Sequence, residues 1–303
     1  MSIFLNANHE LRAGWKFAMY VGFFFIILLA TGVAVAIFQS VGLIGRLTES
    51  QLGILILNDI TLFVPAFTAM WLTIRFVDHR PFRAFGIGFI PQWPRHFVFG
   101  LGISAGMLAL VIAGCFVVGY VSMRWTAGQV SPAILVAWFC VLMGAALNEE
   151  LIFRGFPLQL LIEAIGEWPA IIAISILFGA MHLNNPNASI LGTLNTIVAG
   201  ILLSLAYVRR RSLWMPYGIH VGWNVGLGFV FGFPLSGVDL PSLWTTGTAG
   251  SETILGGGYG PEGGLLGTFV FAAAAVIVER HGSNNRIEAR SGNRPWRHHR
   301  NRA

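Results

Sequence analysis

The sequence predicts an all-α protein, a polytopic membrane bundle of about eight transmembrane helices. Of its 303 residues, 55% are hydrophobic and only 11% are charged, a composition that soluble domains of this size do not have. The basic residues are concentrated in alternate connections between long apolar stretches. Together these two observations indicate a multi-pass protein of the cell membrane.

Eight apolar stretches have about the length of a membrane span, since roughly 20 helical residues cross the hydrocarbon core. The first is too long for the apolar region of a removable signal peptide and lacks a small-residue cleavage site, so it is predicted to be a true span. The predicted spans cover residues 15–38, 53–77, 96–121, 131–153, 168–183, 188–207, 213–233 and 264–279.

The distribution of basic residues predicts the orientation. Most of the 19 Lys and Arg residues fall in the N-terminal segment, the connections after the second and sixth spans, and the C-terminal tail. Because cytoplasmic connections carry an excess of Lys and Arg, both termini are predicted to be cytoplasmic. The tail is polar and basic, so we expect it to be disordered and to lie against anionic lipid. Such segregated charge indicates topology and no nucleic-acid partner.

The chain divides into five regions on these grounds. The loop before the last span is rich in glycine and mildly acidic; it is predicted to be a flexible external connector, with a lid as the alternative. The regions are an N-terminal three-helix membrane region at 1–130, a catalytic four-helix core at 131–233, the external loop at 234–263, the last transmembrane helix at 264–280 and the cytoplasmic tail at 281–303.

Three charged residues interrupt the fourth span. Each charge at the centre of a membrane helix costs roughly 2.5 to 3.5 kcal/mol, so Glu149, Glu150 and Arg154 need partners or a wet cavity. Glu150 and Arg154 are four residues apart and can pair on one helix face. Glu149 then remains as a partly desolvated carboxylate suited to act as a general base. A buried structural ion-pair cluster is the alternative interpretation.

Two histidines lie well inside apolar stretches, and each has a companion at helical spacing. Phe178 lies four residues before His182, so its ring can pack against the imidazole. His220 and Asn224 are also four residues apart and can present hydrogen-bond donors from one face. Each histidine taken alone can be a packing residue. Taken together, the charged and polar residues of these spans provide a base, an orienting pair and donors for an oxyanion.

These motifs resemble those of the CPBP family of intramembrane proteases, which includes CAAX prenyl endopeptidases and bacteriocin-processing enzymes. The motifs are E-E-x-x-x-R from Glu149, F-x-x-x-H from Phe178 and H-x-x-x-N from His220. All three are complete and in order, and the resemblance covers residues 131–233. It implies that Glu149 and His182 activate a water molecule for peptide hydrolysis.

The same resemblance implies the remaining roles. Glu150 and Arg154 would brace the site, with Phe178 as a further supporting residue, and His220 with Asn224 would stabilise the oxyanion. The implied substrate is a peptide or protein at the membrane, with or without a prenyl group.

A metal-dependent mechanism is the main alternative within the enzyme class. The zinc motif H-E-x-x-H is absent, because His9 and Glu10 are followed by L-R-A. Glu149, His182 and His220 are nevertheless a workable set of zinc ligands. The resemblance favours metal-free glutamate catalysis, so we expect no cofactor.

Serine and aspartyl mechanisms find less support. Ser104 lies in G-I-S-A-G, which matches a nucleophile elbow, but here the pattern falls within a continuous apolar helix and is predicted to be a helix-packing site. Asp59 is the only other acid at predicted membrane depth, so an aspartyl dyad cannot form.

A non-enzymatic function remains an alternative from another class. Carboxylates and histidines within a membrane also serve proton-coupled carriers, and the same fold can act as a membrane scaffold or immunity-type protein that binds a partner helix. No internal repeat supports a carrier.

The depths of the site residues conflict if the fourth helix ends near residue 153. Glu149 would then lie near the cytoplasmic side and His182 near the other. Two expectations resolve the conflict: a tilted fourth helix that continues to about residue 163, or a connector after His182 that dips into a polar cavity.

Overall fold

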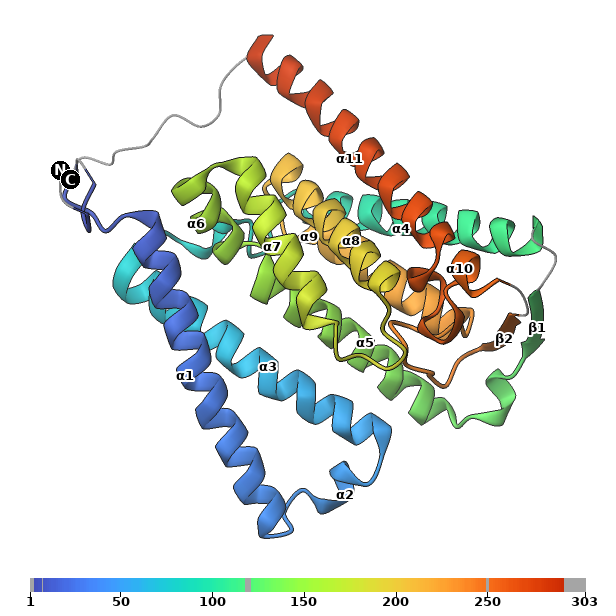
Figure 1. Cartoon of the computed structure of the whole chain (residues 1–303). Helices are drawn as coiled ribbons and strands as arrows, with labels where there is room; N and C mark the ends of the chain where they lie inside the picture. The colour runs from blue at the N-terminus through green and yellow to red at the C-terminus, as the bar shows by residue number, and fades with distance from the viewer. Residues whose placement is uncertain (1–2, 7, 118–120, 249–250, 292–303) are drawn as a thin grey trace.

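The computed structural model describes residues 3–6, 8–117, 121–248 and 251–291. It confirms an all-α bundle, with one short two-stranded sheet at the end where β1 and β2 are marked in Figure 1. The helices are α1 (Ala13–Ser40), α2 (Gly45–Thr48), α3 (Gln51–Thr73), α4 (Trp93–Val117), α5 (Pro132–Phe153), α6 (Phe156–Ile165), α7 (Glu167–Met181), α8 (Ile190–Arg210), α9 (Trp214–Asn224), α10 (Glu252–Leu255) and α11 (Leu265–Ser291), and the strands are β1 (Val121–Trp125) and β2 (Trp244–Thr248).

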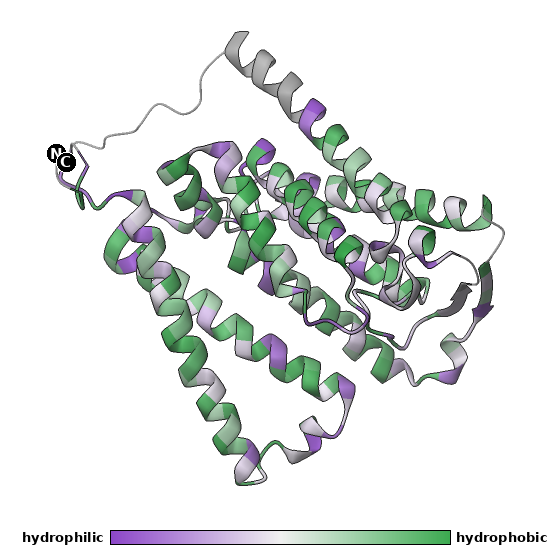
Figure 2. Cartoon of the chain, in the orientation of Figure 1, coloured by the Kyte–Doolittle hydropathy of each residue, from purple (hydrophilic) through white to green (hydrophobic). Residues whose placement is uncertain are grey.

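Long apolar helices confirm the prediction of a multi-pass membrane protein. Figure 2 shows apolar residues along most of their length. Within the described residues, five helical segments are long and apolar enough to cross a membrane: Ala13–Ser40, Gln51–Asp78, Trp93–Val117, Pro132–Ile165 and Ile190–Arg210. Helix α7 is apolar but shorter, so the number of eight spans stays a prediction.

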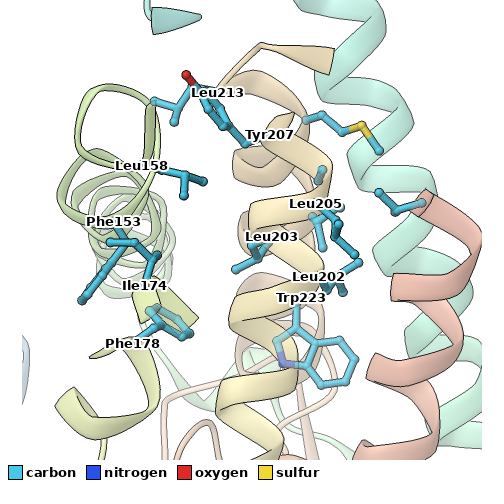
Figure 3. Packing of buried hydrophobic residues seen from close by; sticks show 14 of the residues in the cluster. Phe153, Leu158, Ile174, Phe178, Leu202, Leu203, Leu205, Tyr207, Leu213 and Trp223 are labelled. Carbon is cyan, nitrogen blue, oxygen red and sulfur yellow. The ribbon is translucent and has the colours of Figure 1, made fainter. Parts of the chain in front are cut away.

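Helix α8 lies at the centre of the bundle, in contact with α7, α9 and α11. Its buried side chains point to both sides, with Leu203 on the side of α7 and Leu202 on the opposite side (Figure 3). Burying a large aliphatic side chain stabilises a fold by about 1.5 to 3 kcal/mol in water, whereas within a lipid phase close packing replaces that term. The central helix therefore supplies a rigid wall for what lies beside it.

Glycines allow α4 and α9 to pack at very short range. A side chain at Gly100 would clash with the carbonyl of Met215, and one at Gly222 would clash with the hydroxyl of Ser104. Ser104 is buried, and its hydroxyl donates to the carbonyl of Leu101. Ser104 is therefore a helix-packing residue, as predicted, but side chains at Gly102 and Gly106 would meet open space, so the prediction was wrong for these two glycines.

The fourth helix does not continue to residue 163, so that expectation was wrong. Helix α5 ends at Phe153, Arg154 is extended, and Gly155 has a φ of 63°, a left-handed value that favours glycine. The depth conflict disappears for a different reason. Helix α7 has 15 residues and is about 22 Å long, shorter than the roughly 30 Å hydrocarbon core. Glu149 and His182 line one cavity, and the dip of the connector into the membrane stays a prediction.

The two ends of the bundle are held by different interactions. Strands β1 and β2 pair antiparallel, with Trp125 opposite Trp244, so these two connections lie on one side, as the predicted topology requires. Ion pairs join segments elsewhere: Lys16 with Asp78, Arg80 with Glu163, and Arg209 with Glu167 and Glu279. The cytoplasmic assignment of the termini stays a prediction.

The C-terminal part differs from expectation in one respect. Helix α11 continues to Ser291, where the sequence predicts a disordered tail from residue 281. The segment contains no proline before Pro295, and each added residue gains a backbone hydrogen bond. The rest of the predicted tail, residues 292–303, lies outside the described residues, and its contact with anionic lipid stays a prediction.

Candidate active site

One cavity of about 210 Å³ brings the predicted site residues together. Its walls come from α3, α4, α5, α7, α8, α9, α11 and the segments that follow α7 and α9. Five residues singled out in the sequence line it: Glu149, Phe178, His182, His220 and Asn224. The remaining two, Glu150 and Arg154, are fully buried behind the wall.

Glu150 and Arg154 form the ion pair that their spacing predicts. Arg154 Nη1 lies 3.1 Å from Glu150 Oε1, and neither side chain is exposed. The guanidinium also lies 4.4 Å from the centre of the Phe178 ring, close enough for a cation–π contact. Phe178 therefore contacts the brace as well as the histidine that follows it.

His220 lies between the two adjacent glutamates. Its Nδ1 is 2.9 Å from Glu150 Oε1, and its Nε2 is 3.6 Å from Glu149 Oε2. A carboxylate can only accept, so the Nδ1–H donates to Glu150. Nε2 can then donate to a substrate oxygen only when the ring carries both protons. Glu150 thus fixes the orientation of the His220 ring. Helical spacing could not predict this contact, because the two residues lie on different helices.

His182 occupies the C-terminal cap of α7. Its Nδ1 lies 2.8 Å from the carbonyl oxygen of Phe178, and because a carbonyl only accepts, Nδ1 carries the proton. In the neutral ring Nε2 is then an acceptor available to the cavity. The Phe178 ring lies 4.8 Å from the imidazole, as the four-residue spacing predicts.

Asn224 is the last residue of α9, and the chain continues as a π-helix over Val225–Val230. π-Helical turns within helices are frequent at functional sites, because the extra residue redirects neighbouring side chains. Asn224 lines the same cavity as Glu149 and His182.

Several cavity residues were not predicted from the sequence. Asn185, Trp223, Ser236 and Glu262 line the cavity, and so does Asp59, which had no assigned role. Asn185 lies three residues after His182, and Ser236 lies three residues after the predicted span 213–233. Neither spacing matches a known motif. One feature of the sequence could have indicated Glu262: it is an acidic residue at the end of the glycine-rich loop, directly before an apolar stretch.

The residues considered for zinc lie near one another in this cavity. Among the residues that the structure describes, no three His, Cys, Asp or Glu side chains are arranged to hold a metal ion. The zinc set of Glu149, His182 and His220 stays an alternative.

Comparison with known proteins gives two findings. Residues 131–226 match the family described as type II CAAX prenyl endopeptidase Rce1-like, a range that contains all three motifs. An uncharacterized 24.3 kDa protein of Escherichia coli is 27% identical over 143 residues, which cover 44% of this chain and 64% of that relative.

Proposed function

We propose that this chain, whose residues 131–226 match the type II CAAX prenyl endopeptidase Rce1-like family, hydrolyses a peptide bond at the membrane with a water molecule activated by Glu149. The observation that carries the proposal is the convergence of Glu149, His182, His220 and Asn224 on one cavity. Glu149 comes from α5, His182 from the C-cap of α7, and His220 and Asn224 from α9.

Glu149 is the general base. Its Oε2 atom is buried and has no hydrogen-bond partner among the described residues, and it lies 3.6 Å from His220 Nε2. The Glu149 side chain as a whole is 28% exposed and lines the cavity, so its other carboxylate oxygen can hold a water there. A water held there can transfer a proton to the carboxylate as it attacks the carbonyl carbon.

His182 orients the attacking water. Its Nδ1–H is engaged by the Phe178 carbonyl, so the lone pair of Nε2 is available to accept a hydrogen bond from the water. Two acceptors, the carboxylate of Glu149 and this nitrogen, leave one oxygen lone pair of the water directed at the substrate.

Asn224 and His220 stabilise the oxyanion. The amide of Asn224 provides a donor, and His220 provides a second one from Nε2 once its ring is doubly protonated. Oxyanion donors held rigidly in a site shielded from water are worth about 100-fold to 1,000-fold in rate each. The proton taken by Glu149 then passes to the leaving amine.

The proposed substrate is a peptide or protein at the membrane, with or without a prenyl group, and no cofactor is used. The alternative is a non-enzymatic scaffold, immunity-type protein or carrier. Glu149→Gln separates them, because it removes the base while keeping the size of the side chain. Glu10→Gln, in the exposed N-terminal segment, is the matched control.

The measurement is the set of peptide termini in membranes of cells that express each form. We expect termini present with the wild type and Glu10→Gln to vanish with Glu149→Gln. Identical termini in all three would overturn peptidase function and favour a scaffold.

A further inference from the structure

Glu262 is a buried carboxylate in the wall of the cavity, outside the region that matches the protease family. It lies in a short 3-10 helix, Pro261–Gly263, directly before α11. Its Oε1 accepts from the indole N–H of Trp223 at 2.7 Å. Its Oε2 accepts from the backbone N–H and the hydroxyl of Ser236, at 2.6 and 2.8 Å. Three donors on one carboxylate form a strong, charge-assisted arrangement.

These hydrogen bonds connect two of the three segments that carry the proposed catalytic residues, the connector after His182 and α9. Trp223 directly precedes Asn224. The carbonyl of Ser236 accepts from the side-chain amide of Asn185 at 3.2 Å, and Asn185 lies in the connector three residues after His182. The path from Asn185 through Ser236 and Glu262 to Trp223 therefore runs along the cavity wall, and all four residues line the cavity.

The backbone around Glu262 is held independently of its carboxylate. The amide of Asn195 in α8 donates to the carbonyls of Glu262 and Gly264, each at 2.8 Å. The Trp223 ring packs against Phe271 of α11 at 5.0 Å. Removal of the carboxylate should therefore leave α11 docked, and its effect should be confined to the cavity wall.

The segment that Ser236 belongs to forms part of the cavity wall. Leu235, Ser236, Val238 and Leu240 all line it; we call residues 235–240 the cover segment. Without the Glu262 carboxylate, the buried donors of Trp223 and Ser236 lose their acceptor, and the cover segment loses its hydrogen-bonded link to Trp223 of α9.

We infer that Glu262 is a positioning residue for the proposed hydrolysis: it fixes the cover segment to Trp223, and thereby holds the His182 connector and Asn224 at their working separation. The inference rests on the proposed function. A displacement of about 1 Å in a reacting group is enough to slow a reaction by about 100-fold.

The kinetic test is Glu262→Gln. The amide keeps one oxygen acceptor, but its NH₂ group would face the donors of Trp223 or Ser236. We expect kcat to fall at least tenfold while KM stays within about twofold. Trp223→Phe removes the opposing donor and should give a similar fall, and the double variant should fall no further than either single one. The matched control is Glu279→Gln on α11, which pairs with Arg209 away from the cavity and should leave kcat unchanged. An unchanged kcat in folded Glu262→Gln would overturn the inference.

A second measurement needs no substrate. In a chain with Cys115→Ala and Cys140→Ala, Val238→Cys in the cover segment reports the exposure of that segment to a water-soluble maleimide. We expect Glu262→Gln to speed labelling about tenfold or more, and Glu279→Gln to leave it unchanged. Equal labelling rates overturn the inference whatever the peptidase does. If Glu262→Gln is labelled faster than its parent but the wild type cleaves no peptide, the proposed function is wrong. The conclusion that Glu262 holds the cover segment then still stands.

Discussion

His220 Nδ1 and Glu150 Oε1 lie 2.9 Å apart, so the buried ion pair of α5 holds a histidine of α9 in place. Glu150 accepts from both Arg154 and His220 through the same oxygen. The Glu150 carboxylate that pairs with Arg154 thus also orients the His220 ring, which faces Glu149. Stability and chemistry are coupled at this one carboxylate.

Arg154→Met should reduce the folded yield in detergent as well as activity. The change leaves a buried carboxylate without its cation, at about 3 to 5 kcal/mol. Arg46→Met, at an exposed position, should leave both unchanged. Size-exclusion chromatography of the purified variants measures the yield.

Combining Arg154→Met with Glu150→Leu should restore the yield without restoring activity. An apolar pair avoids the unpaired buried charge, but His220 loses the acceptor that orients it. If the single change left the yield intact, the interpretation of these two residues as a stabilising buried pair would be wrong.

Asn224→Ala should lower kcat by about 100-fold to 1,000-fold with KM nearly unchanged, the usual effect of one lost oxyanion donor. Asn8→Ala is the control, because Asn8 is exposed in the N-terminal segment. Steady-state kinetics on a cleaved peptide provides both parameters. A rise in KM at constant kcat would instead assign Asn224 to substrate binding.

His182→Asn and His182→Gln should both abolish turnover, but only one should preserve stability fully. The Asn amide can take the place of Nδ1–H and donate to the Phe178 carbonyl, whereas the Gln amide extends toward the position of Nε2. Thermal unfolding in detergent should therefore show a higher midpoint for His182→Asn. Full turnover in either variant would remove His182 from the mechanism.

Chelation should leave the rate unchanged, because the proposed reaction uses a carboxylate base. The assay compares turnover before and after incubation with a strong zinc chelator. Loss of turnover that added zinc restores would contradict the glutamate mechanism and make Glu149, His182 and His220 metal ligands.

A reporter fused after Arg302 should be active on the cytoplasmic side, and one inserted at Gly256 on the opposite side. The expectation follows from the excess of basic residues in the predicted inner connections. Alkaline phosphatase and green fluorescent protein fusions distinguish the two sides. The reverse result would contradict the orientation and both predicted cytoplasmic termini.

The sequence alone determined the features that depend on local geometry. Apolar length indicated the membrane bundle, and the four-residue rise of one helical turn predicted that Glu150 meets Arg154 and that Phe178 meets His182. These contacts depend only on residues within one turn, so their spacing is sufficient evidence for them.

Tertiary structure decided the contacts between distant segments. The break at Gly155, the short α7 and the approach of His220 to Glu150 result from the packing of the whole bundle. Glu262 lies 39 residues beyond Trp223 in the chain, and no periodicity relates the two. How the helices pack in space decides which buried donor meets which acceptor, because most buried polar groups bond to the partner that the fold places beside them.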